Sequence, residues 1–322
     1  MMTSYELQAG RLAARPGLPG AGVTPVWIDL FALSAAEEAD VERLVGIDVP
    51  TRDEMQKIEI SSRLYSEDGA LFMTALLPAL SDSGAPDMQP VSFVLAGPTL
   101  LTVRYHAPRA FETFSARAAK VPLGCDSSET VLLALLEAIV ERLADILERI
   151  GRDVDGISRA VFGTAPETDG GVSLKTTLKA IGRAGDLTSQ VRDSLMSLER
   201  LNSFFGQQAL QRKDQNSARE RIKTLEYDIR SLSDHAGFLA QKVTFLLDAT
   251  LGLINIEQNA IIKIFSVVAV AFLPPTLIAS IYGMNFEHMP ELAWPFGYPF
   301  AIGLMIASAI LPWLYFKRRG WL

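Results

Sequence analysis

Cysteine is almost absent from this sequence. Cys125 is the only one, so no Cys-x-x-Cys pair is available for a metal or a redox reaction. This excludes a disulfide-stapled extracellular scaffold and favours a reducing cytoplasm for the polar part of the chain. The first residues also lack the apolar core of a secretory signal peptide, so we expect residues 1–260 to stay in the cytoplasm.

Basic residues are fewer than acidic ones, with a formal net charge of -7 and a pI near 5.2. A nucleic-acid-binding protein normally has a basic face, so we expect no nucleic-acid partner. Enzyme motifs are missing too. Ser233, Asp234 and His235 are adjacent on a predicted helix, point in different directions and cannot form a catalytic triad. We predict that the protein is not an enzyme and has no cofactor.

Charge of either sign is absent from two segments near the C-terminal end, Ile264 to Phe286 and Leu292 to Phe316. Each is long enough to cross a bilayer, which takes about 20 apolar residues. We therefore predict membrane spans at 264–286 and 296–316, a loop at 287–295 that faces outward, and a basic tail at 317–322.

Basic residues flank the two spans on one side only. Lys263 precedes the first span and Lys317, Arg318 and Arg319 follow the second, whereas the loop contains no Lys or Arg. By the positive-inside rule, both termini are cytoplasmic. This predicts a multi-pass membrane protein.

Short strands and capped helices fill the N-terminal third. The glycine- and proline-rich start predicts a flexible segment at 1–25. Ser34–Glu37 and Thr51–Glu54 are capping boxes that open helices, and turn signals at Gly69 and Gly97 predict hairpins. Ile58–Tyr65 is expected to be one of the strands. These signals predict a cytoplasmic α/β domain at 26–125.

Proline is absent between Pro166 and Pro274, and helical spacing of apolar residues begins near Ser127. We predict a helical hairpin region at 126–210 and a stalk helix at 211–263 that continues into the first span. An apolar stripe with steps of four and three residues, a heptad pattern, comprises Leu225, Ile229, Leu232, Ala236, Leu239, Val243, Leu246, Thr250 and Leu253. We expect this coiled-coil stripe to be a seam between chains. The alternative is an internal hairpin packed on residues 172–203.

Two spans have no interior, so a polar path requires several chains around one axis. The first span is the better lining helix, because it carries Ser266, Thr276, Ser280 and an expected break at Pro274–Pro275. A plain membrane anchor for a structural coiled coil is the alternative.

The tripeptide Gly283-Met284-Asn285 closes the first span. It is followed by Met289-Pro290-Glu291-Leu292, the second span and the basic tail, and preceded by Asn259, Lys263 and the Pro-x-Thr of Pro274 and Thr276. This ordered set resembles the CorA family of magnesium and cobalt channels. The resemblance covers residues 255–322 strongly and the whole chain more diffusely.

The resemblance implies an α+β membrane protein that assembles as a homopentameric funnel, with the first spans around the axis and the second spans outside. It implies location in the bacterial inner membrane and uptake of Mg²⁺, and of Co²⁺, down the electrochemical gradient. One branch of the superfamily transports zinc; the intact Gly-Met-Asn favours magnesium over that alternative. Mg²⁺ is then the transported ion and a regulatory one.

The same resemblance assigns roles to individual residues. Mg²⁺ dehydrates reluctantly, so a neutral amide ring suits a hydrated ion, and apolar rings can gate by dewetting. The selectivity filter is Gly283, Met284 and Asn285. The lining residues are Asn259, Ile262, Phe265, Ser266, Leu273, Thr276 and Ser280. The acidic mouth is Glu287 and Glu291. The stalk carboxylates Glu226, Asp228, Asp234 and Asp248 are available to bind regulatory Mg²⁺; the alternative for each is the ordinary solvated face of a coiled coil.

Overall fold

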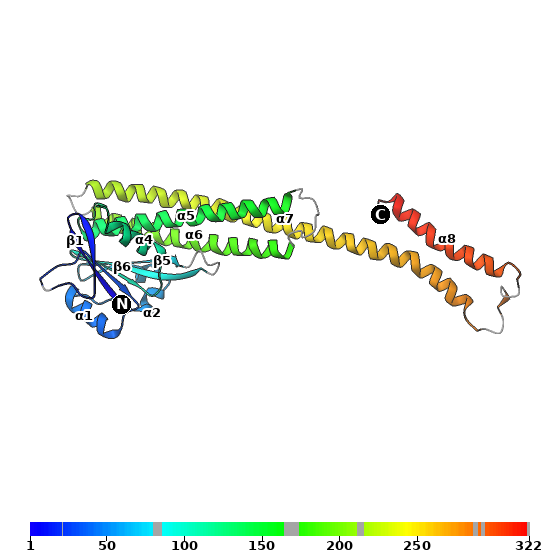
Figure 1. Cartoon of the computed structure of the whole chain (residues 1–322), viewed down its shortest axis with the longest axis horizontal. Coiled ribbons are helices and arrows are strands. Elements are labelled where there is room, and N and C mark those ends of the chain that lie inside the picture. Colours follow the sequence, from blue (N-terminus) through cyan, green and yellow to red (C-terminus); the bar gives the residue numbers. More distant parts are fainter. Residues whose placement is uncertain are drawn as a thin grey trace. The chain divides into compact units, whose positions relative to one another are not determined.

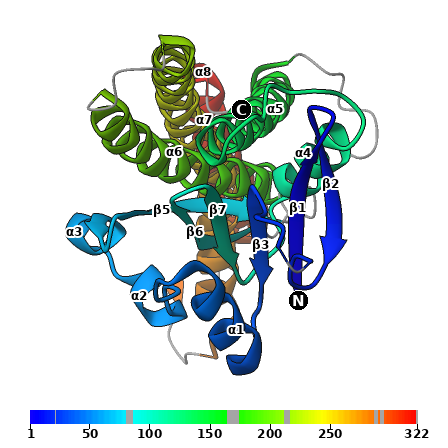
Figure 2. The same cartoon turned by 90° about the vertical axis from the view of Figure 1, so that its left-hand side faces the viewer.

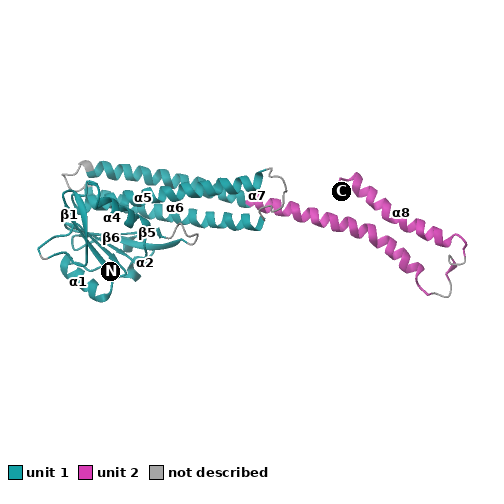
Figure 3. Ribbon diagram, in the orientation of Figure 1, with its two compact units in different colours: residues 1–247 teal, residues 248–322 magenta. Residues whose placement is uncertain are grey.

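The structure is a computed structural model that describes residues 1–20, 22–79, 86–163, 174–210, 216–285, 289–290 and 294–320. The chain forms two compact units, residues 1–247 and 248–322, which are described separately (Figure 3). The first holds one sheet and a helical bundle. The second holds the apolar end of α7 and the helix α8.

A seven-stranded sheet with the order β2-β1-β3-β7-β6-β5-β4 is the centre of the first unit. Neighbouring strands run antiparallel except β3 and β7, which are parallel. The strands are β1 (Met2–Gln8), β2 (Arg11–Pro16), β3 (Trp27–Phe31), β4 (Leu64–Glu67), β5 (Ala70–Ala79), β6 (Asp87–Ala96) and β7 (Thr99–Arg104).

The expectation of a flexible segment at 1–25 is wrong for most of its length. Residues 2–16 form the β1–β2 hairpin, and β1 also pairs with β3. The connection is a tight turn in which Ala9 and Gly10 both have positive φ, the geometry of a type I′ turn. An Ala-Gly pair is a weak turn signal, and proline and glycine follow the hairpin instead of filling it, which is why composition misled the prediction.

Short helices lie on one face of the sheet and the helical bundle on the other (Figure 2), and the two faces bury different side chains. Alternate residues point to opposite faces of a strand, so Trp27, Phe93 and Leu100 pack toward the helical bundle while Ile28, Val94 and Leu101 pack toward α1 (Ala35–Val45) and α2 (Arg52–Gln56). The unit therefore has three layers: short helices, the sheet, and the bundle.

The capping boxes are confirmed. Ser34 accepts from the Glu37 N–H at the start of α1, and Thr51 accepts from the Glu54 N–H at the start of α2. The predicted pairing across Gly97 is confirmed as β6–β7, and the turn at Gly69 joins β4 and β5. The expected strand over Ile58–Tyr65 is wrong at its start, because Ile60–Arg63 forms the one-turn helix α3 and pairing begins at Leu64.

Three long helices lie side by side on one face of the sheet: α5 (Ser128–Phe162), α6 (Leu174–Leu210) and the first part of α7 (Asn216–Tyr282), with α4 (Arg109–Ala118) between α5 and the sheet edge (Figure 1). α6 also closes an exposed strand edge, since the Leu76 N–H of β5 donates to Ser197 Oγ at 2.9 Å. An unpaired edge would otherwise invite pairing with another chain.

The apolar stripe of α7 packs inside its own chain. Leu225, Ile229, Ala236, Leu239 and Leu246 are at most 2% exposed and belong to the same core as α5 and α6. The expected inter-chain seam is therefore wrong over this segment, and the internal alternative holds, with α5 as a further partner. Glycines allow the close approach: a Cβ on Gly206 of α6 would lie 3.2 Å from the Ile222 side chain.

The second unit contains both predicted spans. Helix α7 continues to Tyr282 through Pro274 and Pro275, so the predicted proline break does not interrupt the helix. α8 runs over Gly297–Arg318. Both helices are long and apolar enough to cross a membrane, and the most apolar stretch of each is almost wholly uncovered within the chain. Their apolar surface needs lipid or other chains to cover it.

Candidate functional site

The Gly-Met-Asn tripeptide follows the last residue of α7. The Gly283 N–H donates to Ala279 O at 2.9 Å and the Met284 N–H to Ile281 O at 3.3 Å, so the backbone completes one more turn before Asn285. All three residues are exposed. Gly283 does not adopt a left-handed conformation, which argues against the ordinary left-handed glycine cap as the reason for a glycine here. Glycine is favoured at this position for a steric reason, because a Cβ on residue 283 would lie only 3.1 Å from Ala279 O.

The predicted lining residues share one face of α7. Steps of three and four residues connect Asn259, Ile262, Ser266, Leu273, Thr276, Ser280 and Gly283, with one gap at Ala269. Such steps keep side chains on one side of a helix. Leu273 is 66% exposed and Ile262 is 60% exposed, and the polar members other than the half-buried Ser266 are exposed as well. The structure thus brings this set together on an uncovered face.

The hydroxyls of Ser266 and Thr276 bond back to their own helix. Ser266 Oγ donates to Ile262 O at 2.8 Å, and Thr276 Oγ1 donates to Phe272 O at 2.7 Å. A hydroxyl that has committed its proton in this way keeps only acceptor capacity toward the outside. These two oxygens can therefore accept hydrogen bonds from the waters around a hydrated cation. Their O–H groups do not point outward, so they place no positive hydrogen toward the cation.

Two adjustments to the predicted set follow from the spacing. Phe265 and Ser266 are adjacent, so their side chains diverge by about 100° and cannot both point at one axis. Phe265 lies to the side of the face. Ala269 and Asn255, which the prediction missed, fall on it by the same count. The regular spacing was the signal that would have found them.

Neither acidic mouth residue can be placed. Glu287 and Glu291 lie outside the described residues, as does most of the 287–295 loop. Their contribution to the site remains a prediction from charge alone.

The candidate regulatory carboxylates form no metal site in the part of the chain that the structure describes. Glu226, Asp228, Asp234 and Asp248 are all exposed on α7. Among the described residues, no cluster of three or more His, Cys, Asp or Glu side chains could hold a metal ion. A metal site at these positions would need ligands beyond those that the described residues of one chain bring together.

Ion pairs attach the stalk part of α7 to α5. Arg221 forms a bidentate pair with Glu137, with both N···O distances 2.9 Å, and the carboxylate bond raises the pKa of Arg221. Lys242 pairs with Asp155, which lowers the pKa of that carboxyl group. These pairs are partly exposed, so they orient the helices more than they stabilise them.

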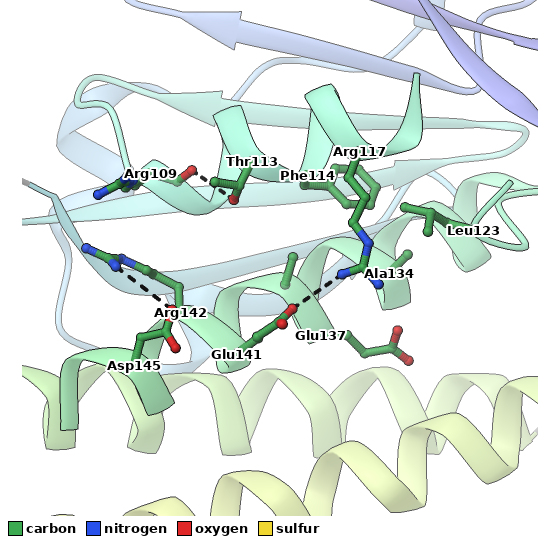
Figure 4. Close-up of a pocket in the computed structure, with 11 residues that line it drawn as sticks. Arg109, Thr113, Phe114, Arg117, Leu123, Ala134, Glu137, Glu141, Arg142 and Asp145 are labelled. Carbon is green, nitrogen blue, oxygen red and sulfur yellow. Dashed lines mark hydrogen bonds and ion pairs between the residues drawn. The ribbon is translucent and has the colours of Figure 1, made fainter. Parts of the chain in front are cut away.

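A cavity of about 510 Å³ lies between α4 and α5 (Figure 4). It is lined by arginines and carboxylates that pair with one another: Arg117 with Glu141 at 3.5 Å and Arg142 with Asp145 at 4.0 Å. Because these charges are balanced inside the cavity, it offers neither a metal site nor a strong anion site.

Known proteins resemble the chain over its full length. The family model described as CorA-like Mg²⁺ transporter protein matches residues 23–318. The chain belongs to this family. "Magnesium transport protein CorA" of Escherichia coli (strain K12) is 38% identical over 326 residues, and that of Yersinia pseudotuberculosis serotype I (strain IP32953) is 38% identical over 324 residues; each alignment covers 100% of both chains.

The family fold is found in a solved structure as well. "The complete structure of CorA magnesium transporter from Methanocaldococcus jannaschii" matches with a TM-score of 0.75 and 19% identity, covering 100% of this chain and 99% of the other. At that identity the match shows the fold alone. The CorA-family fold of an N-terminal α/β domain, a very long helix and a second C-terminal apolar helix is therefore confirmed.

Proposed function

We propose that this chain transports Mg²⁺, and with it Co²⁺, into the cell through a homopentameric pore. The observation that carries the proposal is full-length identity of 38% to proteins named for magnesium transport, combined with a Gly-Met-Asn end on an uncovered helix face. A membrane potential suffices as the driving force, since each charge gains roughly 2.3 kcal/mol per 100 mV.

The uncovered face of α7 supports the assembly around an axis. Thr276 and Ser280 place polar groups on a span that otherwise presents apolar side chains to a bilayer, and Asn259 continues the same face of α7 just before the span. Polar groups within a membrane face a protein or a water-lined path. A ring of copies with this face inward provides both the path and the covering, and leaves the apolar α8 outside against lipid.

Selectivity is assigned to Asn285 at the outer end of the pore. Mg²⁺ holds its waters tightly, so a neutral amide ring that accepts from those waters avoids the cost of dehydration. The helix C-terminus behind it adds about half a negative charge per copy, which favours a cation at this point. Gly283 allows the chain to turn out of the helix without a side chain in the opening, and Met284 lies between the two.

We assign the gate of the pore to rings of apolar side chains, one from each copy. Leu273 and Ile262 lie on the lining face below Thr276, and rings of such side chains can block ions by excluding water. Ser266 and Ala269 have small side chains, so the pore is wider between the Ile262 and Leu273 rings. Phe265 flanks this path instead of lining it.

The topology completes the proposal. Residues 26–125 and 126–210 form the cytoplasmic part, 211–263 the stalk, 264–286 and 296–316 the spans of the inner membrane, 287–295 the outer loop and 317–322 the cytoplasmic tail. Glu287 and Glu291 raise the local cation concentration at the mouth. Glu226, Asp228 and Asp234 would bind regulatory Mg²⁺ between copies.

The test is Asn285→Ala in reconstituted full-length protein. Uptake of Mg²⁺ into vesicles, followed with an internal fluorescent indicator at fixed negative-inside potential, is expected to fall at least tenfold, because the amide oxygens that hold the hydrated ion are lost. Thr244→Ala is the matched control: Thr244 is exposed on α7 and donates to Ala240 O, but lies in the stalk. Its uptake should equal that of the wild type.

The same assay separates the alternatives. A zinc transporter would move Zn²⁺ faster than Mg²⁺ and respond to a proton gradient. A structural coiled-coil anchor would show no flux of any divalent ion, and Asn285→Ala would leave growth of a Mg²⁺-requiring strain unchanged.

A further inference from the structure

Three consecutive cations close α8. Lys317, Arg318 and Arg319 are exposed in its last turn and at the residue that follows it. Gly320 adopts a left-handed conformation and its N–H donates to Lys317 O at 3.2 Å, while the Arg319 N–H donates to Tyr315 O at 3.1 Å. The cations therefore sit on a helix end with defined hydrogen bonding.

Two of these cations fold back over aromatic rings. Lys317 Nζ lies 4.9 Å from the centroid of the Trp313 ring, and Arg319 Cζ lies 5.5 Å from that of Tyr315. Each ring precedes its cation by four residues, one turn of about 5.4 Å toward the apolar part of the helix. The charges are thus drawn toward the level of the rings. In a membrane, Trp and Tyr lie in the headgroup region.

The length of α8 puts this end at a membrane surface. Its 22 residues span about 33 Å at 1.5 Å per residue, close to the roughly 30 Å of a hydrocarbon core. If Gly297 lies at one interface, Lys317 reaches the opposite headgroup layer. Phosphodiester groups are the anions found there.

The two cation and ring pairs point in different directions. Trp313 and Tyr315 are two residues apart and diverge by roughly 200° around the helix. One pair therefore faces lipid whichever side of α8 is turned outward. The helix dipole and the positive-inside rule explain why the charges at this end of α8 are positive. They do not explain why the side chains turn back toward the span instead of reaching into water.

We propose that the Lys317–Arg319 end of α8 binds the headgroup of an anionic phospholipid in the cytoplasmic leaflet. The ligand is a phosphodiester with an uncompensated negative charge, held by the cations beside a Trp or Tyr ring. The proposal rests on the crossing of the bilayer by α8 that the proposed function requires.

The test uses full-length protein in vesicles that contain spin-labelled phosphatidylglycerol or spin-labelled phosphatidylcholine. The fraction of immobilised label gives the relative affinity of the protein for each lipid. The wild type is expected to prefer phosphatidylglycerol. Lys317→Gln with Arg319→Gln should reduce that preference by roughly fivefold for each charge removed. An unchanged preference, or a wild type with none, overturns the proposal.

Matched variants separate this site from charge in general. Lys223→Gln with Arg230→Gln removes the same charge from exposed positions of α7 in the first unit and should leave the preference unchanged. Lys317→Arg with Arg319→Lys keeps the charges and should retain it. If the Gln variant loses the helix content or oligomer size of the wild type, Trp313→Leu, which keeps every charge but removes one ring, replaces it and should still lower the preference.

Two further arms identify the source of the anion and isolate the proposal. An excess of inorganic phosphate should not displace the spin-labelled lipid, whereas displacement would indicate a free-anion site and contradict a lipid site. The readout needs no ion flux. Protein that selects phosphatidylglycerol but moves no Mg²⁺ contradicts the proposed function alone, and protein that moves Mg²⁺ without lipid selection contradicts this inference alone.

Discussion

At the scale of one residue, Asn285 provides the neutral oxygen of the proposed pore. A conducting site must bind an ion strongly enough to admit it and weakly enough to release it. A carboxylate ring would hold a divalent cation too firmly, and an apolar ring would not draw it from water. In the proposed pore the Asn285 amide would accept hydrogen bonds from the waters of the ion without adding net charge, and the residue is exposed beyond Tyr282.

His106 is a buried titratable group in the first unit. It is 5% exposed, its Nε2 lies 2.8 Å from Leu77 O, and its buried Nδ1 has no hydrogen-bond partner among the described residues. Burial lowers the pKa of His106 below its usual value of 6.5, the neighbouring Arg104 acts in the same direction, and the Leu77 carbonyl and Asp87 oppose the shift. The folded state therefore favours the neutral ring.

We expect His106 to make the fold less stable in mild acid. Its folded pKa is below its unfolded one, so the unfolded chain takes up the proton first as the pH falls. The stabilisation is complete above pH 6.5 and is lost as the pH falls through the lower folded value. Hydrogen exchange of β5 and β7 amides in full-length protein, corrected for intrinsic rates, should show this loss below pH 6.5. In His106→Gln, which keeps a donor for Leu77 O, the slope in that range should disappear; an unchanged slope would assign it to other groups.

At the scale of elements, α7 carries two faces with different partners. Leu239 is 2% exposed and packs in the bundle core, whereas its neighbour Phe238 is 59% exposed. The stalk therefore uses one face to build the chain's own fold and leaves the other open.

Adjacent substitutions on α7 should separate these faces. Leu239→Ala is expected to lower the free energy of unfolding by about 2–5 kcal/mol, because it removes buried methyl groups and leaves a cavity. Phe238→Ala should change it by less than about 0.5 kcal/mol in the isolated chain, as exposed positions usually do. Thermal unfolding of detergent-solubilised protein, compared with its oligomer size, measures both. If Phe238→Ala lowered the free energy of unfolding more than Leu239→Ala did, the stripe would instead be a contact between chains.

At the scale of the whole molecule, the proposed pore predicts which residues meet across an axis. Leu273 lies on the lining face, and Ile264, nine residues earlier, lies roughly 180° away; both are more than half exposed in the single chain. In a Cys125→Ala background, Leu273→Cys is expected to form disulfides between copies on mild oxidation in membranes, and Ile264→Cys is not. Particles should have five times the 35.2 kDa chain mass by light scattering after subtraction of detergent. Equal cross-linking at both positions, or a monomeric mass, would rule out the pore.

Helices and strands were predicted correctly where the residues that specify them are close together in the sequence. Capping boxes at Ser34 and Thr51 position a side-chain oxygen three residues from its donor, and uncharged runs of span length need no knowledge of distant residues. The β1–β2 hairpin was missed because its stability comes from pairing with β3, more than twenty residues away. The predicted strand start at Ile58 was wrong for a related reason, because β4 forms only where it pairs with β5.

The sequence by itself determined that two C-terminal helices are apolar enough to cross a membrane, that α7 has a heptad-spaced apolar stripe, and that Gly283-Met284-Asn285 closes the first span. The tertiary structure alone decided what covers the stripe. Heptad spacing states that one face of a helix is buried, but the helices of the same chain and those of another copy bury it with equal chemistry. Only the path of α5 and α6 back along α7 distinguishes them, and it leaves the opposite face open.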